Sequence, residues 1–176
     1  MATASDTLAS LNQRWEVPSA PKPIVVIGAG SIVRDAHLPT YRRLKFPVAG
    51  IFDVNHAVAV QGAEQFKIPR VFDSLEEACT ADAVFDVAVP PNQIAAILDK
   101  MRPGSAVLIQ KPMGRNLADA RRIVALCRQR TLTAALNFQL RFAPNMLALR
   151  DAIARVMLGE ITDLEVRIVL HTPWNY

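Results

Sequence analysis

Strand-like and helix-like segments alternate strictly through the chain from residue 23 to residue 138. The first strand is expected at residues 23–28, PIVVIG, where a β-branched run ends at a glycine, as in a buried parallel strand. Further strands are expected at residues 48–53, 70–72, 83–89, 106–110 and 133–138. Helical patterns separate them, near residues 31–44, 55–66, from 74 onward, 92–101 and in an arginine-rich segment before the last strand. This alternation predicts an α/β fold with one doubly wound parallel sheet.

The composition is typical of a globular protein with one sizeable core. Hydrophobic residues make up 51% and charged residues 20% of the 176 residues, unlike the composition of disordered chains. Cys79 and Cys127 lack metal-ligand spacing, so neither a disulfide framework nor a metal site is expected. The first residues lack the basic and apolar regions of a leader, and no apolar stretch has spanning length. We therefore expect a cytoplasmic protein without membrane association.

The net charge of +4 and the pI near 9.4 make nucleic acid one candidate partner. The arginines, however, alternate with an apolar stripe at spacings of three and four, which is typical of an amphipathic helix. The arginines are Arg115, Arg121, Arg122, Arg128 and Arg130, and the stripe is Leu117, Ala120, Val124 and Cys127. A solvated helix face is the favoured interpretation, and we expect no nucleic-acid partner.

Glycines follow the first expected strand, in the segment Gly28-Ala29-Gly30-Ser31-Ile32. Gly28 would permit a tight turn. Gly30 would let the backbone approach a pyrophosphate at the positive end of the next helix. This placement predicts a Rossmann dinucleotide site formed by residues 28–32, although an ordinary turn between strand and helix is the alternative.

Asp53 ends the second expected strand, at the spacing where an acidic residue meets the adenosine ribose. A carboxylate there would accept hydrogen bonds from both ribose hydroxyls and repel a 2′-phosphate, so NAD is favoured over NADP. The alternative role of Asp53 is to cap the following helix.

Two later strand ends carry further candidate residues, because ligands of open α/β sheets bind outside the carboxyl ends of strands. Pro90 would hold the turn after the fourth strand close to the cofactor, and Asn92 would cap the next helix or, as the less favoured role, bind a ribose. Gln110 and Lys111 end the fifth strand. Pro112 would fix the Lys111 ammonium near the cleft, whereas the alternative is a plain surface lysine.

Several of these segments together resemble the Gfo/Idh/MocA oxidoreductases. The similarity lies in GAGSIVRDAHLP (28–39), DVAVPP (86–91), QKPMGRNLADARRI (110–123), NFQLRFAPN (137–145) and GEI (159–161). It implies hydride transfer between a nicotinamide cofactor and a sugar- or polyol-type alcohol, with Lys111 as the catalytic residue beside the nicotinamide and Arg141 near the cleft. It also implies a cis Lys111–Pro112 bond.

The sequence differs from the family pattern at three positions. Gln110 replaces a glutamate, Val33 replaces a small residue, and Ile94 stands where a histidine is usual. His37, His56 and His171 show no partner spacing and are expected to be surface or capping residues. A non-catalytic dinucleotide-binding module with a regulatory or interaction role is the alternative to an oxidoreductase.

Three segments are expected along the chain: an N-terminal tail at 1–22, a dinucleotide-binding domain at 23–138, and the start of a substrate or dimerisation domain at 139–176. The last segment is expected to hold one helix, near residues 144–158, and one half-buried strand, near residues 161–171. We expect that domain to be incomplete, the chain to be inactive alone, and any homo-oligomer to form through this segment.

Overall fold

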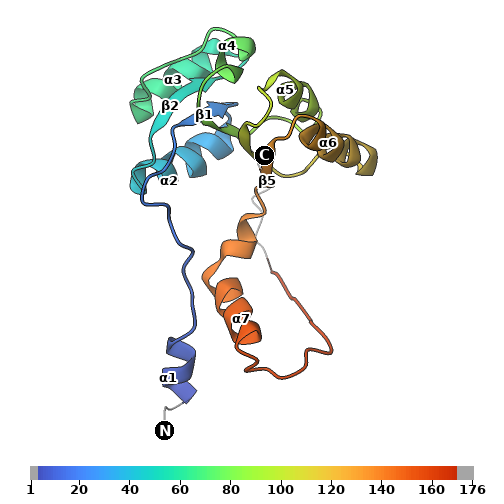
Figure 1. Cartoon of the computed structure of the whole chain (residues 1–176). Coiled ribbons are helices and arrows are strands. Elements are labelled where there is room, and N and C mark those ends of the chain that lie inside the picture. The colour runs from blue at the N-terminus through green and yellow to red at the C-terminus, as the bar shows by residue number, and fades with distance from the viewer. Residues whose placement is uncertain (1–3, 170–176) are drawn as a thin grey trace. The chain divides into compact units, whose positions relative to one another are not determined.

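The computed structural model describes residues 4–169 of the chain (Figure 1). The chain forms two compact units. One is Val17–Phe138, and the other combines Met1–Glu16 with Gln139–Tyr176. Each unit is described by itself below.

A five-stranded parallel sheet forms the centre of the unit Val17–Phe138 (Figure 1). Its strands lie in the order β2-β1-β3-β4-β5, and every neighbouring pair is parallel. The bounds are β1 Ile24–Ile27, β2 Val48–Phe52, β3 Val84–Val87, β4 Ala106–Ile109 and β5 Thr133–Leu136. The predicted doubly wound α/β fold is confirmed, because strand order reverses about β1 and β3 as in a Rossmann sheet.

Helices connect the strands of this sheet. They are η1 Val33–His37, α2 Leu38–Arg43, α3 His56–Phe66, α4 Leu75–Cys79, α5 Ile94–Lys100 and α6 Leu117–Gln129. The expected helix at residues 31–44 contains a π-helical segment, η1, before α2. Ser74 and Asn116 cap α4 and α6, since each side chain accepts a hydrogen bond from a backbone N–H three residues later.

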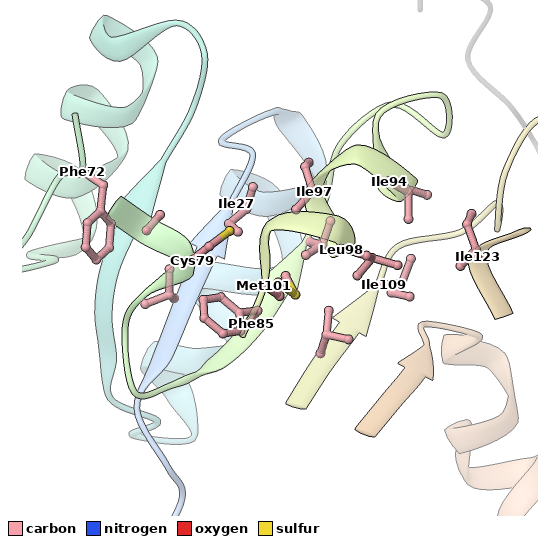
Figure 2. Packing of buried hydrophobic residues seen from close by; sticks show 14 residues of the cluster. Ile27, Phe72, Cys79, Phe85, Ile94, Ile97, Leu98, Met101, Ile109 and Ile123 are labelled. Carbon is pink, nitrogen blue, oxygen red and sulfur yellow. The ribbon is translucent and has the colours of Figure 1, made fainter. Parts of the chain in front are cut away.

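Alternate residues of each strand point to opposite faces, so the sheet separates two apolar cores. On one face Val26 and Ile51 pack with Val33, Leu38 and Ala59 of the helices η1, α2 and α3. On the other face, α4, α5 and α6 cover a larger core (Figure 2), which includes Ile27, Phe72, Cys79, Phe85, Ile94, Ile97, Leu98, Met101, Ile109 and Ile123.

The arginine-rich helix α6 buries less of its apolar stripe than its spacing suggests. Ile123 is buried, whereas Leu117 is 65% exposed. Leu117, Ala120 and Val124 line an open groove together with Arg121 and Arg128. The helix therefore packs on the sheet through a narrower face than predicted.

The short strand expected at residues 70–72 is present only as a single bridge beside β2. Val71 forms a single parallel bridge with Ile51, outside the named strands. Pro69 precedes the bridge and has no N–H to extend a ladder, while Ser74 already caps helix α4.

In the unit formed by both ends of the chain, all regular elements within the described residues are helices. They are α1 Ala4–Ala9, η2 Gln139–Phe142 and α7 Pro144–Ala154. The strand expected at residues 161–171 is wrong for residues 161–169, which have no regular structure, and residues 170–171 lie outside the described residues. A lone strand without a neighbour to pair with is unstable in water, which accounts for the difference. Within residues 4–169, no helix has the length and apolarity to cross a membrane.

Candidate functional site

The turn after β1 brings the first two candidate glycines together. Gly28 has φ +98°, and its N–H donates to the Phe52 carbonyl at 2.8 Å. A Cβ atom at Gly28 would lie 2.3 Å from the Ala88 carbonyl oxygen, so only glycine fits between these strand ends. At Gly30, by contrast, a Cβ atom would meet no atom within 4 Å among the described residues. The turn is thus closed at Gly28 and open at Gly30.

The helix that follows begins beside this opening. Ser31 and Ile32 are exposed at its first turn, where backbone N–H groups have no helical carbonyl to bind. Such a turn favours an anion, because its free N–H groups and the helix dipole both point toward it. Val33, where a small residue is usual, is fully buried in the core beneath the turn. Val33, although larger than the usual residue, therefore places no side chain on the exposed surface of the turn.

Asp53 is bound to the same turn. One of its carboxylate oxygens accepts a hydrogen bond from the Ala29 N–H at 2.7 Å, and the other accepts from the Asn55 N–H at 2.8 Å. Asn55, not Asp53, occupies the N-cap of α3. The alternative role of Asp53 as that helix cap is therefore wrong, and its carboxylate lies at the end of β2 beside the glycine turn.

The loop after β3 is a tight turn in which Gln93 N–H donates to the Pro90 carbonyl at 2.9 Å. Pro90 and Asn92 are both exposed. Helix α5 begins at Ile94 with Gln93 at its N-cap. The prediction that Asn92 caps this helix is wrong, because the turn delays the helix by one residue.

Lys111 follows the last residues of β4, and the Lys111–Pro112 bond is cis, as predicted. Its side chain is exposed, whereas Gln110 is buried at 8% exposure. The Gln110 side-chain oxygen accepts a hydrogen bond from the Lys111 backbone N–H at 2.8 Å. Gln110 thus holds the backbone from which the lysine projects.

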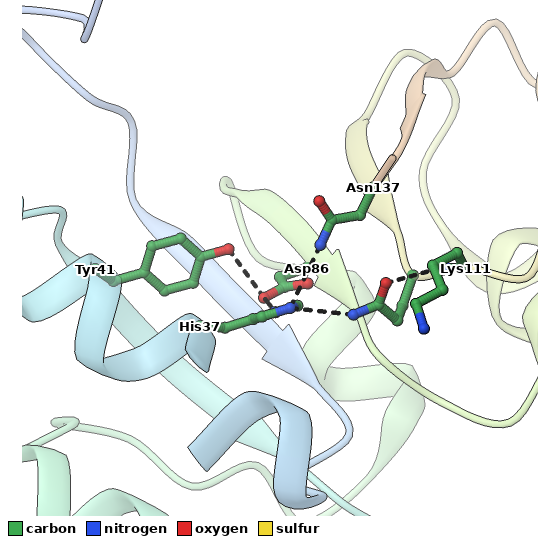
Figure 3. A network of polar contacts seen from close by, with 6 residues as sticks. His37, Tyr41, Asp86, Lys111 and Asn137 are labelled. Atoms are coloured by element: carbon green, nitrogen blue, oxygen red, sulfur yellow. Dashed lines mark hydrogen bonds and ion pairs between the residues drawn. The ribbon is translucent and has the colours of Figure 1, made fainter. Parts of the chain in front are cut away.

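A polar network centred on the buried side chains of His37 and Asp86 adjoins Gln110 (Figure 3). His37 Nδ1 lies 2.7 Å from Asp86 Oδ2, and the Tyr41 hydroxyl donates to the same oxygen at 2.9 Å. On the other side of the ring, His37 Nε2 lies 3.2 Å from Gln110 Nε2 and 3.4 Å from Asn137 Nδ2. We call these five residues the His37 network.

The His37 network joins α2 and its π-helical start to three neighbouring strand segments. Asp86 belongs to β3, Gln110 follows β4 and Asn137 follows β5. Asp86 is 1% exposed and its Oδ1 has no hydrogen-bond partner among residues 4–169. Burial raises the pKa of the Tyr41 hydroxyl well above its usual range, and the nearby Asp86 charge and hydrogen bond raise it further. Tyr41 therefore stays a hydrogen-bond donor at neutral pH.

The expectation that His37 is a surface or capping residue is wrong. His37 is 9% exposed and belongs to the buried network. His56 is 59% exposed and lies 3.6 Å from Asp73, as expected of a surface histidine, whereas His171 lies outside the described residues. Sequence reasoning could have found His37 from Asp86, because a charged residue within an apolar strand needs a buried partner.

Arg141 belongs to the other compact unit. It lies in η2, where its guanidinium carbon is 5.5 Å from the centre of the Phe142 ring. Its expected place near the cleft stays a prediction. Within residues 4–169, no group of three or more histidine, cysteine, aspartate or glutamate side chains could hold a metal ion.

Comparisons with known proteins agree on one family. Residues 22–138 match the GFO_IDH_MocA oxidoreductase family, described as having an NAD-binding Rossmann fold. The chain is 30% identical over 156 residues to human trans-1,2-dihydrobenzene-1,2-diol dehydrogenase, covering 85% of this chain and 47% of that protein. It is 32% identical to the bovine enzyme of the same name over 142 residues, covering 77% of this chain and 42% of that protein.

Solved structures show the same fold. UDP-N-acetylglucosamine 3-dehydrogenase from Acidithiobacillus ferrooxidans superposes with a TM-score of 0.67 at 25% identity, over 76% of this chain and 43% of that one. An NAD-binding oxidoreductase from Klebsiella pneumoniae gives a TM-score of 0.71 at 22% identity, over 80% and 40% of the two chains. The chain thus spans less than half the length of these relatives.

Proposed function

This chain belongs to the Gfo/Idh/MocA oxidoreductase family, and on that premise we propose that it binds NAD for hydride transfer to or from a sugar- or polyol-type alcohol. The observation that carries the proposal is the turn after β1. It is closed at Gly28, open at Gly30, and bound by its Ala29 N–H to the Asp53 carboxylate.

The open side of this turn supports a dinucleotide pyrophosphate. The backbone at Gly30 has no neighbour within 4 Å of an added Cβ among the described residues, so a phosphate group has room there. The N–H groups of Ser31 and Ile32 would then donate to its oxygens at the start of the helix. The turn thus offers backbone donors at the start of a helix, the usual pattern for a Rossmann pyrophosphate.

The Asp53 carboxylate supports NAD over NADP. Its two oxygens already accept one hydrogen bond each, from Ala29 and Asn55, and each has a further lone pair. A ribose diol can donate to those lone pairs, whereas a 2′-phosphate would be repelled by the carboxylate. Exposed Pro90 and Asn92 at the end of β3 would contact the middle of the dinucleotide.

Lys111 is the proposed catalytic residue. Its ammonium projects from the carboxyl end of β4, the side of the sheet on which the turn after β1 also lies. When bound, the nicotinamide would accept or supply the hydride. Lys111 would donate a hydrogen bond to the substrate oxygen and stabilise the negative charge that develops there. Arg141, in η2 of the other unit, stays in the proposal as a cofactor-binding residue on the family resemblance alone.

The proposed substrate class follows the relatives, whose names describe dehydrogenases of a dihydrodiol and of a nucleotide sugar. Each compound in these names has a hydroxyl-bearing carbon that a nicotinamide cofactor can oxidise. We therefore expect a secondary alcohol with neighbouring hydroxyl groups.

The test is to titrate the 176-residue protein with NADH and, separately, with NADPH. Nicotinamide fluorescence or calorimetry measures the binding. We expect saturable binding of both, with NADH tighter. A panel of polyols and sugars with NAD then tests turnover. Absence of dinucleotide binding would contradict the proposal. Turnover of any member of the panel would exclude the non-catalytic module, and it would also contradict the expectation that this chain is inactive alone.

A further inference from the structure

The Lys111 backbone fixes the orientation of the Gln110 amide. A backbone N–H can only donate, so the Gln110 atom 2.8 Å from Lys111 N must be the side-chain oxygen. The other end of the amide, the NH₂ group, then faces His37 Nε2 at 3.2 Å. Gln110 therefore donates to His37 and cannot accept from it.

This orientation fixes the protons of the His37 ring. Because Gln110 donates to Nε2, that nitrogen must carry a lone pair, and the second amide donor, Asn137 Nδ2, approaches the same atom at 3.4 Å. The ring proton is then on Nδ1, where it donates to Asp86 Oδ2 at 2.7 Å. All hydrogen bonds of His37 are consistent with one neutral tautomer.

We propose that His37 and Asp86 are positioning residues that act on Lys111 through Gln110, a role that rests on the proposed function of Lys111. Asp86 accepts the hydrogen bond from His37 Nδ1 and so keeps the ring proton on that nitrogen. The unprotonated Nε2 accepts the hydrogen bond from the Gln110 amide. The Gln110 side-chain oxygen then accepts the hydrogen bond from the Lys111 backbone N–H. The chain of bonds runs in one direction from the strand end to the buried carboxylate (Figure 3).

Burial gives this network the rigidity that positioning requires. Asp86 is 1%, Gln110 8% and His37 9% exposed, so water competes little for their polar atoms. A glutamate at position 110 would keep an oxygen for the Lys111 N–H but would present a second oxygen to His37 Nε2. An ionised carboxylate in that place is satisfied when His37 carries protons on both ring nitrogens, whereas a protonated carboxyl group would donate to the unprotonated Nε2.

The first experiment measures the ring nitrogens of His37 by NMR in the 176-residue protein, without cofactor. We expect the neutral tautomer, with a protonated Nδ1 and an unprotonated Nε2. In Gln110→Glu, the Nε2 signal should move to the protonated position. Gln61→Glu is the matched control, because it makes the same chemical change at an exposed position of α3. Carboxyl NMR signals of the variant report whether the new carboxyl group is ionised. A protonated Nε2 in the unmodified protein, or an unprotonated Nε2 in Gln110→Glu while that carboxyl group is ionised, would overturn the proposal.

The second experiment separates positioning from stability. His37→Phe keeps a ring but removes the acceptor for Gln110, so exchange of the Lys111 amide hydrogen should accelerate roughly tenfold relative to that of Leu108, as for loss of one hydrogen bond. Tyr41→Phe removes a bond to the same Asp86 oxygen but none to Gln110. It should leave the His37 tautomer and the relative exchange of Lys111 unchanged. Equal acceleration in both variants would reduce the network to a structural role.

Neither measurement requires a bound dinucleotide. A chain that fails to bind NADH would contradict the proposed function and leave the NMR results standing. Conversely, a chain that binds NADH but shows the other His37 tautomer would contradict only the positioning role.

Discussion

The Asp53 carboxylate accepts the Ala29 N–H at 2.7 Å, so the end of β2 is bonded directly to the turn after β1. A substitution can therefore separate this bond, which shapes the glycine turn, from the proposed contact of the carboxylate with an adenosine ribose.

We expect Asp53→Asn and Asp53→Ser to relax the preference for NADH over NADPH. Loss of the charged acceptor should weaken NADH binding by about 1–3 kcal/mol, the range for hydrogen bonds to charged groups. Asparagine can still accept from Ala29 through its oxygen, so it should cost less stability than serine, whose hydroxyl is shorter. Titration with both cofactors and urea unfolding measure the two effects. Equal affinities for both cofactors in the unmodified protein would contradict the assignment.

Gly28 and Gly30 form a matched pair for a second prediction. Gly28→Ala should unfold or strongly destabilise the protein, because its Cβ would lie 2.3 Å from the Ala88 oxygen at a φ of +98°. In Gly30→Ala the added Cβ atom would have no neighbour within 4 Å in the described part of the chain, so the melting temperature should be unchanged. The substitution should nevertheless weaken NADH binding, since the added methyl group occupies the space proposed for the pyrophosphate. Unaltered NADH affinity in Gly30→Ala would place the pyrophosphate elsewhere.

Lys111→Met should leave NADH affinity within about twofold, because the proposed partner of the ammonium is the substrate oxygen and the side chain is exposed. In a version of the enzyme with a complete second domain, kcat should fall far more, by at least about a hundredfold. Lys22→Met, at another exposed position of the same unit, is the control. If binding and turnover fell together, Lys111 would have a structural role.

The strands were predictable because their physical signal is local. Apolar β-branched runs such as residues 24–27 can be buried on both faces only in a covered parallel sheet, and all four residues of β1 are buried. Residues 161–169 show the limit of that reasoning. Their alternation is equally regular, but a strand requires a neighbour, and a local pattern does not indicate whether one is present.

The glycine turn and Asp53 were likewise predictable from spacing, whereas the His37 network was not. His37 and Tyr41 are four residues apart and so share one helix face, and Asp86 is a lone charge in an apolar strand. Each of these features indicates that a polar side chain needs a hydrogen-bond partner inside the protein. Their pairing, however, joins residues 49 and 73 positions apart along the chain, and this depends on the register of β3 and β4 against the helix.

The partly buried Tyr41 hydroxyl makes the stability of the fold depend on pH in the alkaline range. Its pKa is raised in the folded protein, chiefly by burial and also by Asp86, above the value of about 10 in an unfolded chain. Its contribution is therefore complete below pH 10 and is lost as pH rises further, because only the unfolded state releases the proton. Burial also raises the pKa of the Cys79 thiol, to about 11. Its contribution to stability is therefore also lost as pH rises, beginning at a lower pH than that of Tyr41.

Tyr41→Phe isolates the tyrosine contribution, since Cys79 is present in both proteins and its effect cancels in the difference. At pH 8 the variant should be less stable by about 1–3 kcal/mol, because it loses a hydrogen bond to a buried carboxylate. At pH 11 the difference should shrink by about 1.4 kcal/mol, the linkage expected one unit above the unfolded pKa. Urea unfolding at pH 8, 10 and 11 provides the measurement. A stability difference that stays constant across this range would show that Tyr41 ionises equally in the folded and unfolded states, and would exclude the buried bond to Asp86.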